Sequence, residues 1–214
     1  MKRITLLFLI SGLTINFLSA QDNDYQTSMK EVVANIQEAA FGEDLTPYAN
    51  QMERIAAVEK KEWLPLYWAS FCYMMKSFSE PMSEKKDQLI EKAEQLVAAA
   101  DSLMPKNDEI AVLRANLASA RLSVDPQNRW QKYGPISAIA IATAKSLNPD
   151  NPRIALHEAQ GVFYTPEAFG GGKEKALPLI KTTIEQFSKF KPASDIMPNW
   201  GESAARYMLA EAEK

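Results

Sequence analysis

Two residues of this 214-residue chain have the side chains best suited to catalysis or metal binding, and each type occurs once: a histidine, His157, and a cysteine, Cys72. A metal site built from His or Cys needs three or four such ligands, so these counts argue against that class of site. A Cys–His nucleophile pair would require the two residues to meet, although they lie far apart in the chain. We therefore interpret Cys72 as a buried, inert thiol and His157 as an exposed or partly packed helix residue.

Other catalytic patterns are also missing from the sequence. There is no Gly-x-Ser-x-Gly motif, which would place a nucleophilic serine on a strand-to-helix turn. Carboxylates are abundant but spread along the chain, as on any helical surface. We expect a protein that is not an enzyme, with no catalytic residue, no metal and no cofactor.

A glycine-rich stretch, Phe169-Gly170-Gly171-Gly172, directly precedes Lys173 and Lys175. Free backbone N–H groups at a helix start can cradle a phosphate, which would make this stretch an anion site. It lacks the Gly-Lys-Ser/Thr ending of a P-loop, however. The alternative, which we favour, is a tight turn that needs positive φ, with Phe169 inserted into the core.

The elements that must position these residues follow from an internal repeat. Residues 102–107, Ser-Leu-Met-Pro-Lys-Asn, recur at 146–151 as Ser-Leu-Asn-Pro-Asp-Asn, an offset of 44 residues. A repeat near this length is typical of a helical solenoid. Good helix formers are abundant and two-residue alternation is missing. We predict an all-α chain of about nine helices arranged as antiparallel pairs.

The chain begins with a segment that has the proportions of a secretory signal peptide. Lys2 and Arg3 precede an almost wholly apolar run, which ends at Ser19-Ala20, a small-residue cleavage site. The alternative is a retained membrane anchor, for which the run is short. We predict a signal peptide over 1–20 and a single domain over 21–214, with repeats at 62–105, 107–149 and 151–192 and a capping helix at 199–212.

Small and apolar residues recur at matching places in the second helix of each repeat: Ala93, Val97, Ala100 and Pro105; then Ser137, Ile141, Ala144 and Pro149; then Ala176, Ile180 and Thr183. This spacing resembles the second helix of a tetratricopeptide repeat. The small residue of the first helix corresponds to Ala69, Ala115 and Ala159. The period departs from the family, at 44 residues here against about 34. The resemblance implies a right-handed α-α solenoid.

Tetratricopeptide arrays bind peptides or partner proteins in a concave groove. Carried over by position, this property places the following residues in the groove: Trp63, Tyr73, Asn116, Arg153, Gln160 and Tyr164. For Trp63 and Tyr73 the alternative is core packing. The turns inside the repeats should emerge on one edge beside the groove, with Trp130, Tyr133 and Phe169 in edge loops.

These observations predict an exported protein-interaction module, periplasmic or secreted, that binds a protein or peptide partner in its groove. The alternative is a periplasmic binder of a small ligand, such as one associated with a transporter. A closed pocket lined by Trp63, Tyr73 and Tyr164 would favour the ligand binder, and an open groove would favour the partner module. The formal charge is −3, which argues against a nucleic-acid partner, because such proteins present a basic surface.

Overall fold

The structure is a computed structural model that describes residues 11–39 and 42–214, with side chains from residue 24 onwards. In these residues there are nine α-helices, one short 3-10 turn and no strand, which confirms the predicted all-α class. Residues 1–10 of the predicted signal peptide lie outside the described residues. Within the described part, none of the helices has the length and apolar character that a membrane crossing requires.

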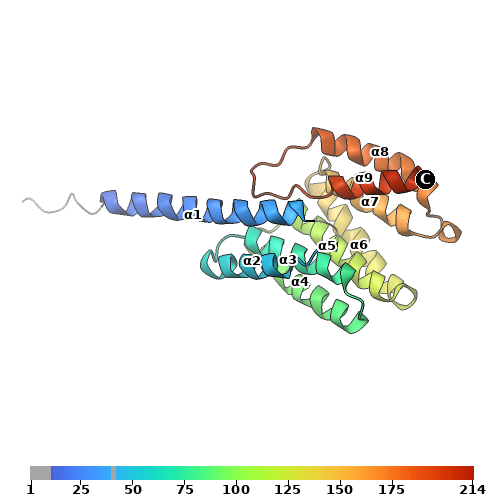
Figure 1. Cartoon of the computed structure of the whole chain (residues 1–214), viewed down its shortest axis with the longest axis horizontal. Helices are drawn as coiled ribbons and strands as arrows, with labels where there is room; N and C mark the ends of the chain where they lie inside the picture. Colours follow the sequence, from blue (N-terminus) through green and yellow to red (C-terminus); the bar gives the residue numbers. More distant parts are fainter. Residues whose placement is uncertain (1–10, 40–41) are drawn as a thin grey trace, which may run out of the picture.

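The helices follow one another through short connections (Figure 1). Their bounds are α1 Ser11–Glu38, α2 Thr46–Val58, α3 Leu64–Ser79, α4 Ser83–Leu103, α5 Asp108–Val124, α6 Pro126–Leu147, α7 Pro152–Tyr164, α8 Lys173–Lys189 and α9 Glu202–Ala212, with the 3-10 turn η1 at Glu167–Phe169. The N-terminal part of α1 projects from the body of the molecule, whereas its C-terminal part packs on α2 and α3.

Neighbouring helices pack on one another along the chain. The most extensive contacts join α3 to α4, α5 to α6 and α7 to α8, and further contacts join α4 to α5 and α8 to α9. Ala69, Ala115 and Ala159, the small residues singled out in the sequence, are fully buried in α3, α5 and α7. Small side chains at crossing points allow helices to approach closely, so these alanines fit the close packing of each pair.

The most buried helix is α3. Its sequence is apolar on almost all sides, which is typical of a helix surrounded by others, and Tyr67 and Trp68 are completely buried. Trp63, Tyr67, Trp68 and Phe71 form a series of edge-to-face ring contacts with centroid distances of 5.5–5.6 Å. Pro65 lies in the first turn, where its missing N–H has no helical partner to lose.

A long connection between α8 and α9, residues 190–201, crosses back to α1 and α3, and we call it the strap (Figure 1). The indole Nε1 of Trp68 donates a hydrogen bond to the carbonyl of Ile196 at 2.9 Å. The Trp200 indole donates to the Tyr67 hydroxyl, also at 2.9 Å. Lys30 of α1 pairs with Asp195 at 2.5 Å. The strap therefore covers Tyr67 and Trp68 of α3.

Two predictions about where helices lie are wrong. The last helix begins at Glu202 rather than at 199, because Gly201 has φ +117° at the N-cap position, a conformation that ends the extended strap and that glycine adopts readily. Trp130 and Tyr133 lie on α6 and not in a loop. Asp125 caps α6 by accepting a hydrogen bond from the Asn128 N–H at 3.4 Å, Pro126 opens the helix, and the helix continues through Pro135.

Candidate functional site

The residues predicted to line a groove do not share one open surface. Trp63 is 7 % exposed and Arg153 is completely buried, because the strap and the N-terminal helices cover this side of the molecule. Tyr73 is half-buried, and its hydroxyl donates to the Glu53 carboxylate at 2.8 Å. Tyr164, by contrast, is 65 % exposed. Neither the open groove nor a closed pocket of Trp63, Tyr73 and Tyr164 is present in the described residues.

Arg153 holds together the interior between α5, α7 and the strap. Its Nε donates to Glu109 Oε2 at 2.8 Å, and its Nη2 donates to Glu109 Oε1. The guanidinium lies over the ring of Phe190 at 4.6 Å and near the ring of Trp200 at 5.8 Å. A buried charge needs a partner in this way, so the role of Arg153 in the described structure is internal.

Asn116 and His157 meet in a polar cluster between α5, α6 and α7. His157 Nδ1 lies 3.0 Å from Asn116 Oδ1, and Nε2 lies 2.9 Å from the Ser137 hydroxyl. This is the geometry of a nucleophile, a base and an orienting group. Yet Ser137 is buried within a helix, where the neighbouring N–H groups are used in helical hydrogen bonds and cannot stabilise an oxyanion. The cluster therefore joins helices and does not resemble a site for acyl transfer.

Four large aromatic side chains gather at one end of the molecule, where α6 begins and α7 ends: Trp130, Tyr133, Tyr164 and Phe169. We call this set the aromatic edge. Trp130 is 58 % exposed and Phe169 is 82 % exposed. The turn between α5 and α6 and the turn between α7 and α8 lie on this same side of the molecule (Figure 1). Large exposed apolar patches on soluble proteins often mark binding sites, which makes this end of the molecule a candidate.

Two helical glycines flank the same region. Gly134 lies on α6 and Gly161 on α7, and a Cβ atom built on either residue would have no other atom within 4 Å. Glycine within a helix is less favourable than alanine by about 1 kcal/mol. Gly134 precedes Pro135, whose ring disfavours a residue with a Cβ before it in a helix, whereas a Cβ at Gly161 would meet no packed neighbour. Open space above the backbone, beside exposed rings, suits a flat ligand. Gln160, next to Gly161, is half-buried and can offer its amide there.

Lysine side chains lie on the elements that carry the aromatic edge. Lys132 Nζ lies 5.0 Å from the centre of the Tyr133 ring. Lys173 Nζ lies 5.9 Å from that of Phe163 and also pairs with Glu211 at 3.2 Å. Lys175 donates to the Gly170 carbonyl at 3.2 Å. Burial, and then the nearby Tyr207, raises the pKa of Tyr164, so its hydroxyl stays protonated at neutral pH. The region thus combines flat apolar rings with cations that can pair with carboxylates.

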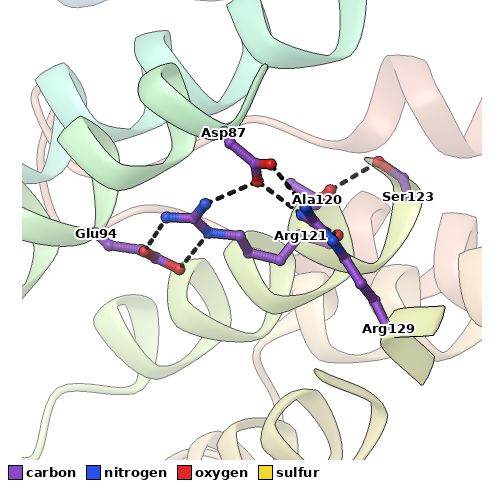
Figure 2. Close-up of polar contacts among 6 residues, drawn as sticks. All are labelled: Asp87, Glu94, Ala120, Arg121, Ser123 and Arg129. Carbon is purple, nitrogen blue, oxygen red and sulfur yellow. Dashed lines mark hydrogen bonds and ion pairs between the residues drawn. The ribbon is translucent and has the colours of Figure 1, made fainter. Parts of the chain in front are cut away.

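An ion-pair network fixes the start of α6 beside the aromatic edge (Figure 2). The Asp87 carboxylate accepts from Arg121 Nη1 at 2.8 Å and from both terminal nitrogens of Arg129 at 2.7 Å. Arg121 also binds Glu94, at 3.1 and 2.7 Å. Hydrogen bonds from Arg129 and Arg121 lower the pKa of Asp87 to about 2. Residues of α4, α5 and α6 are thereby linked, and Arg129 directly precedes Trp130.

The glycine-rich stretch is a turn, as favoured from the sequence, but with two differences. Gly170 and Gly172 have φ +89° and +111°, whereas Gly171 is required because a Cβ there would lie 2.2 Å from the Thr165 carbonyl oxygen. The N–H groups of Gly171 and Gly172 donate to the carbonyls of Pro166 and Val162, so they are not free for an anion. Phe169 is exposed and does not enter the core.

Comparisons with known proteins identify a relative. No protein-family model matches the chain, and no curated protein matches it either. A solved structure, the HusA haemophore from Porphyromonas gingivalis, matches with a TM-score of 0.76 and 38 % sequence identity, over 88 % of this chain and 92 % of that chain. The chain belongs to the family of the HusA haemophore.

The HusA relationship corrects the predicted function. A haemophore is a haem-carrying protein, so the relative is named for binding a small ligand. The prediction of a tetratricopeptide-like scaffold that binds a protein or peptide in its groove is therefore wrong. The predicted alternative, a small-ligand binder, agrees better with the relative.

Sequence reasoning found most of the aromatic edge but missed how it is built. Trp130, Tyr133 and Phe169 were predicted as edge residues, and Tyr164 was assigned to the groove. The two helical glycines and the His157 cluster were missed. A signal was present in the sequence: Gly134 and Gly161 interrupt otherwise good helical segments, and such glycines usually have a packing or functional reason.

Proposed function

We propose that this protein binds and carries haem or a closely related porphyrin. The observation that carries the proposal is its 38 % identity to the HusA haemophore over 92 % of that chain. The proposal includes transport outside the cytoplasm, in the periplasm or beyond, in line with the predicted signal peptide. It assigns the chain no enzymatic activity.

We place the porphyrin on the aromatic edge. A porphyrin is a flat, largely apolar ring with two carboxylates, and offset stacking on aromatic side chains stabilises such rings. Trp130 and Tyr164 can stack on the ring, and the absence of side chains at Gly134 and Gly161 leaves room for it. Lys132 can pair with one of its propionates. Both ring nitrogens of His157 already have partners, so the proposal relies on stacking and not on this histidine as an iron ligand.

The test is a spectroscopic titration of residues 21–214 with hemin at pH 7.5. We expect the Soret band to shift and to saturate at a defined ratio of hemin to protein. Metal-free protoporphyrin should quench the tryptophan fluorescence of the protein by energy transfer, because stacking needs no iron. A chain that leaves both spectra unchanged would overturn the proposal. Serum albumin serves as the positive control for hemin quality.

We also infer that α3 to α8 form three repeats of a tetratricopeptide-like, right-handed solenoid. The complete burial of Ala69, Ala115 and Ala159, and of Ala93, Ala144 and Ala176 in the partner helices, supports this inference, because small residues recur wherever helices cross. An experimental structure would test it through the handedness of successive pairs. A left-handed or non-repeating stack would contradict it.

A further inference from the structure

The imidazole of His157 is a junction of three helices. It extends from α7 to Asn116 of α5 at 3.0 Å and to Ser137 of α6 at 2.9 Å. Ser137 in turn bonds to the Ala115 carbonyl at 3.2 Å and lies 3.3 Å from the Ser119 hydroxyl. His157 therefore joins the middle of α7 to both α5 and α6, whereas Arg153 and Glu109 join its first turn to α5.

The aromatic edge lies at a fixed spacing from this junction. Trp130 precedes Ser137 by seven residues, and Tyr164 follows His157 by seven. Seven residues are two helical turns, about 10 Å, and return to the same helix face. The chain reverses between the end of α6 at Leu147 and the start of α7 at Pro152, so both rings lie on the same side of the junction. A movement of α7 at His157 would change the separation of the two rings.

The surroundings of His157 favour the neutral form of its imidazole. Burial lowers the pKa of His157 to about 4. The groups that face the ring from α5 and α6, Asn116 and Ser137, carry no charge. The charged neighbour is Glu158, which opposes the effect of burial only in part and pairs with Lys145 of α6 at 3.2 Å. Protonation is therefore favoured by opening the junction to water.

We propose that His157 is a positioning residue that controls the release of the porphyrin: its contacts with Asn116 and Ser137 hold α7 in place, and mild acid opens them. This inference rests on the proposed function, and it adds a regulation to that site. The aromatic edge stays assembled while the imidazole is neutral. Protonation loosens α7, separates Tyr164 from Trp130 and frees the ligand.

The experiment measures the rate of hemin transfer from the loaded protein to excess apomyoglobin at pH 7.5 and 5.5. For a group with a pKa near 4 when closed and near 6.5 when open, the open population and the release rate rise about tenfold over this range. His157→Gln keeps a polar group at the junction and cannot titrate. We expect its release rate to change less than about twofold, with hemin binding at pH 7.5 retained.

The experiment distinguishes failure of this inference from failure of the proposed function. An equal rise in release rate for the native protein and His157→Gln would overturn this inference, and so would a constant rate in the native protein. Absence of hemin binding at pH 7.5 would instead overturn the proposed function. Should His157→Gln fail to fold, as judged by circular dichroism, His157→Asn replaces it. Amide exchange of residues 157–164 in the native protein gives a second readout, because the opening should rise about tenfold there as well.

Discussion

The indole N–H of Trp200 donates a hydrogen bond to the hydroxyl of Tyr67 at 2.9 Å, although 133 residues separate them in the chain. Tyr67 is completely buried in α3, and burial raises the pKa of its hydroxyl. The Trp200 ring also packs on Phe71, with a centroid distance of 5.0 Å. One strap residue therefore satisfies a buried polar group of α3 and also lies near Arg153 of α7, which was predicted to line a groove.

Replacement of Trp200 should destabilise the whole domain. Trp200→Phe keeps a ring but leaves the Tyr67 hydroxyl without its donor, which costs about 1–3 kcal/mol. Trp200→Ala also removes the packing and should cost about 3 kcal/mol or more. Urea unfolding followed by circular dichroism measures both. Trp130→Ala is the matched control, because this exposed tryptophan should change the unfolding free energy by less than about 0.5 kcal/mol. Equal effects of Trp200→Ala and Trp130→Ala would show that the strap contributes little.

Removal of rings from the aromatic edge should weaken hemin binding and leave the fold intact. Each stacking contact contributes about 1 kcal/mol, so Trp130→Ala with Tyr164→Ala should raise the Kd for hemin about tenfold or more. The melting temperature should hardly change, since both side chains are exposed. Met104→Ala with Leu147→Ala, which removes exposed apolar groups from other helix ends, should leave the Kd unaltered. Unfolding of the first double variant would show that the rings belong to the core.

Alanine at Gly171 should be far more damaging than alanine at Gly170. A Cβ at position 171 would lie 2.2 Å from the Thr165 carbonyl oxygen and 2.6 Å from that of Val162, so the turn must move, at a cost of about 3 kcal/mol or more. At Gly170 the space is open, and only the left-handed φ of +89° is unfavourable, at about 1–2 kcal/mol. Thermal unfolding of the two variants compares the costs. The reverse order would contradict the close approach at Gly171.

Gly134→Ala should separate stability from binding. A Cβ at this helical position meets no distant residue, but the following Pro135 disfavours it in a helix. The gain expected for Gly→Ala is therefore offset, and the unfolding free energy should change by less than about 1 kcal/mol. The variant should still raise the Kd for hemin, because the methyl group occupies the space assigned to the porphyrin. Ser146→Ala, an exposed position at the other end of α6, is the control: it should bring a similarly small change in stability without a change in Kd. If the Gly134→Ala variant binds hemin as tightly as the native protein, the porphyrin does not bind beside this part of α6.

The stability of the protein should fall in mild acid because of His157. The pKa of His157 is lowered by burial to about 4 from about 6.5 in the unfolded chain. The unfolded state therefore takes up the proton first, and stability is lost as the pH falls from about 6.5 towards 4, by about 3 kcal/mol in total. Asp87, with a pKa of about 2, loses its contribution only at lower pH. Urea midpoints at pH 7.5, 5.5 and 4.5 measure this loss, and His157→Gln should lack it.

The sequence by itself determined the helical class and the positions where helices cross. Both depend on local properties: helix propensity, a 3.6-residue periodicity, and small residues such as Ala115 and Ala159 at matching places in the repeat. The aromatic character of the edge could also be predicted, because turns within repeats collect on one side. Even so, Trp130 was assigned to an edge loop, although α6 already begins at Pro126.

Only the tertiary structure decided what happens to the groove and to His157. Residues 190–201 show no helical or strand pattern, so nothing local indicates that Trp200 reaches Tyr67 or that Asp195 pairs with Lys30. These contacts depend on the folded path of the chain over more than a hundred residues. The same holds for His157, whose partners Asn116 and Ser137 come from two other helices. Sequence periodicity indicates which side of a helix is buried. Which residues of other helices contact that side depends on how the helices pack in the folded protein.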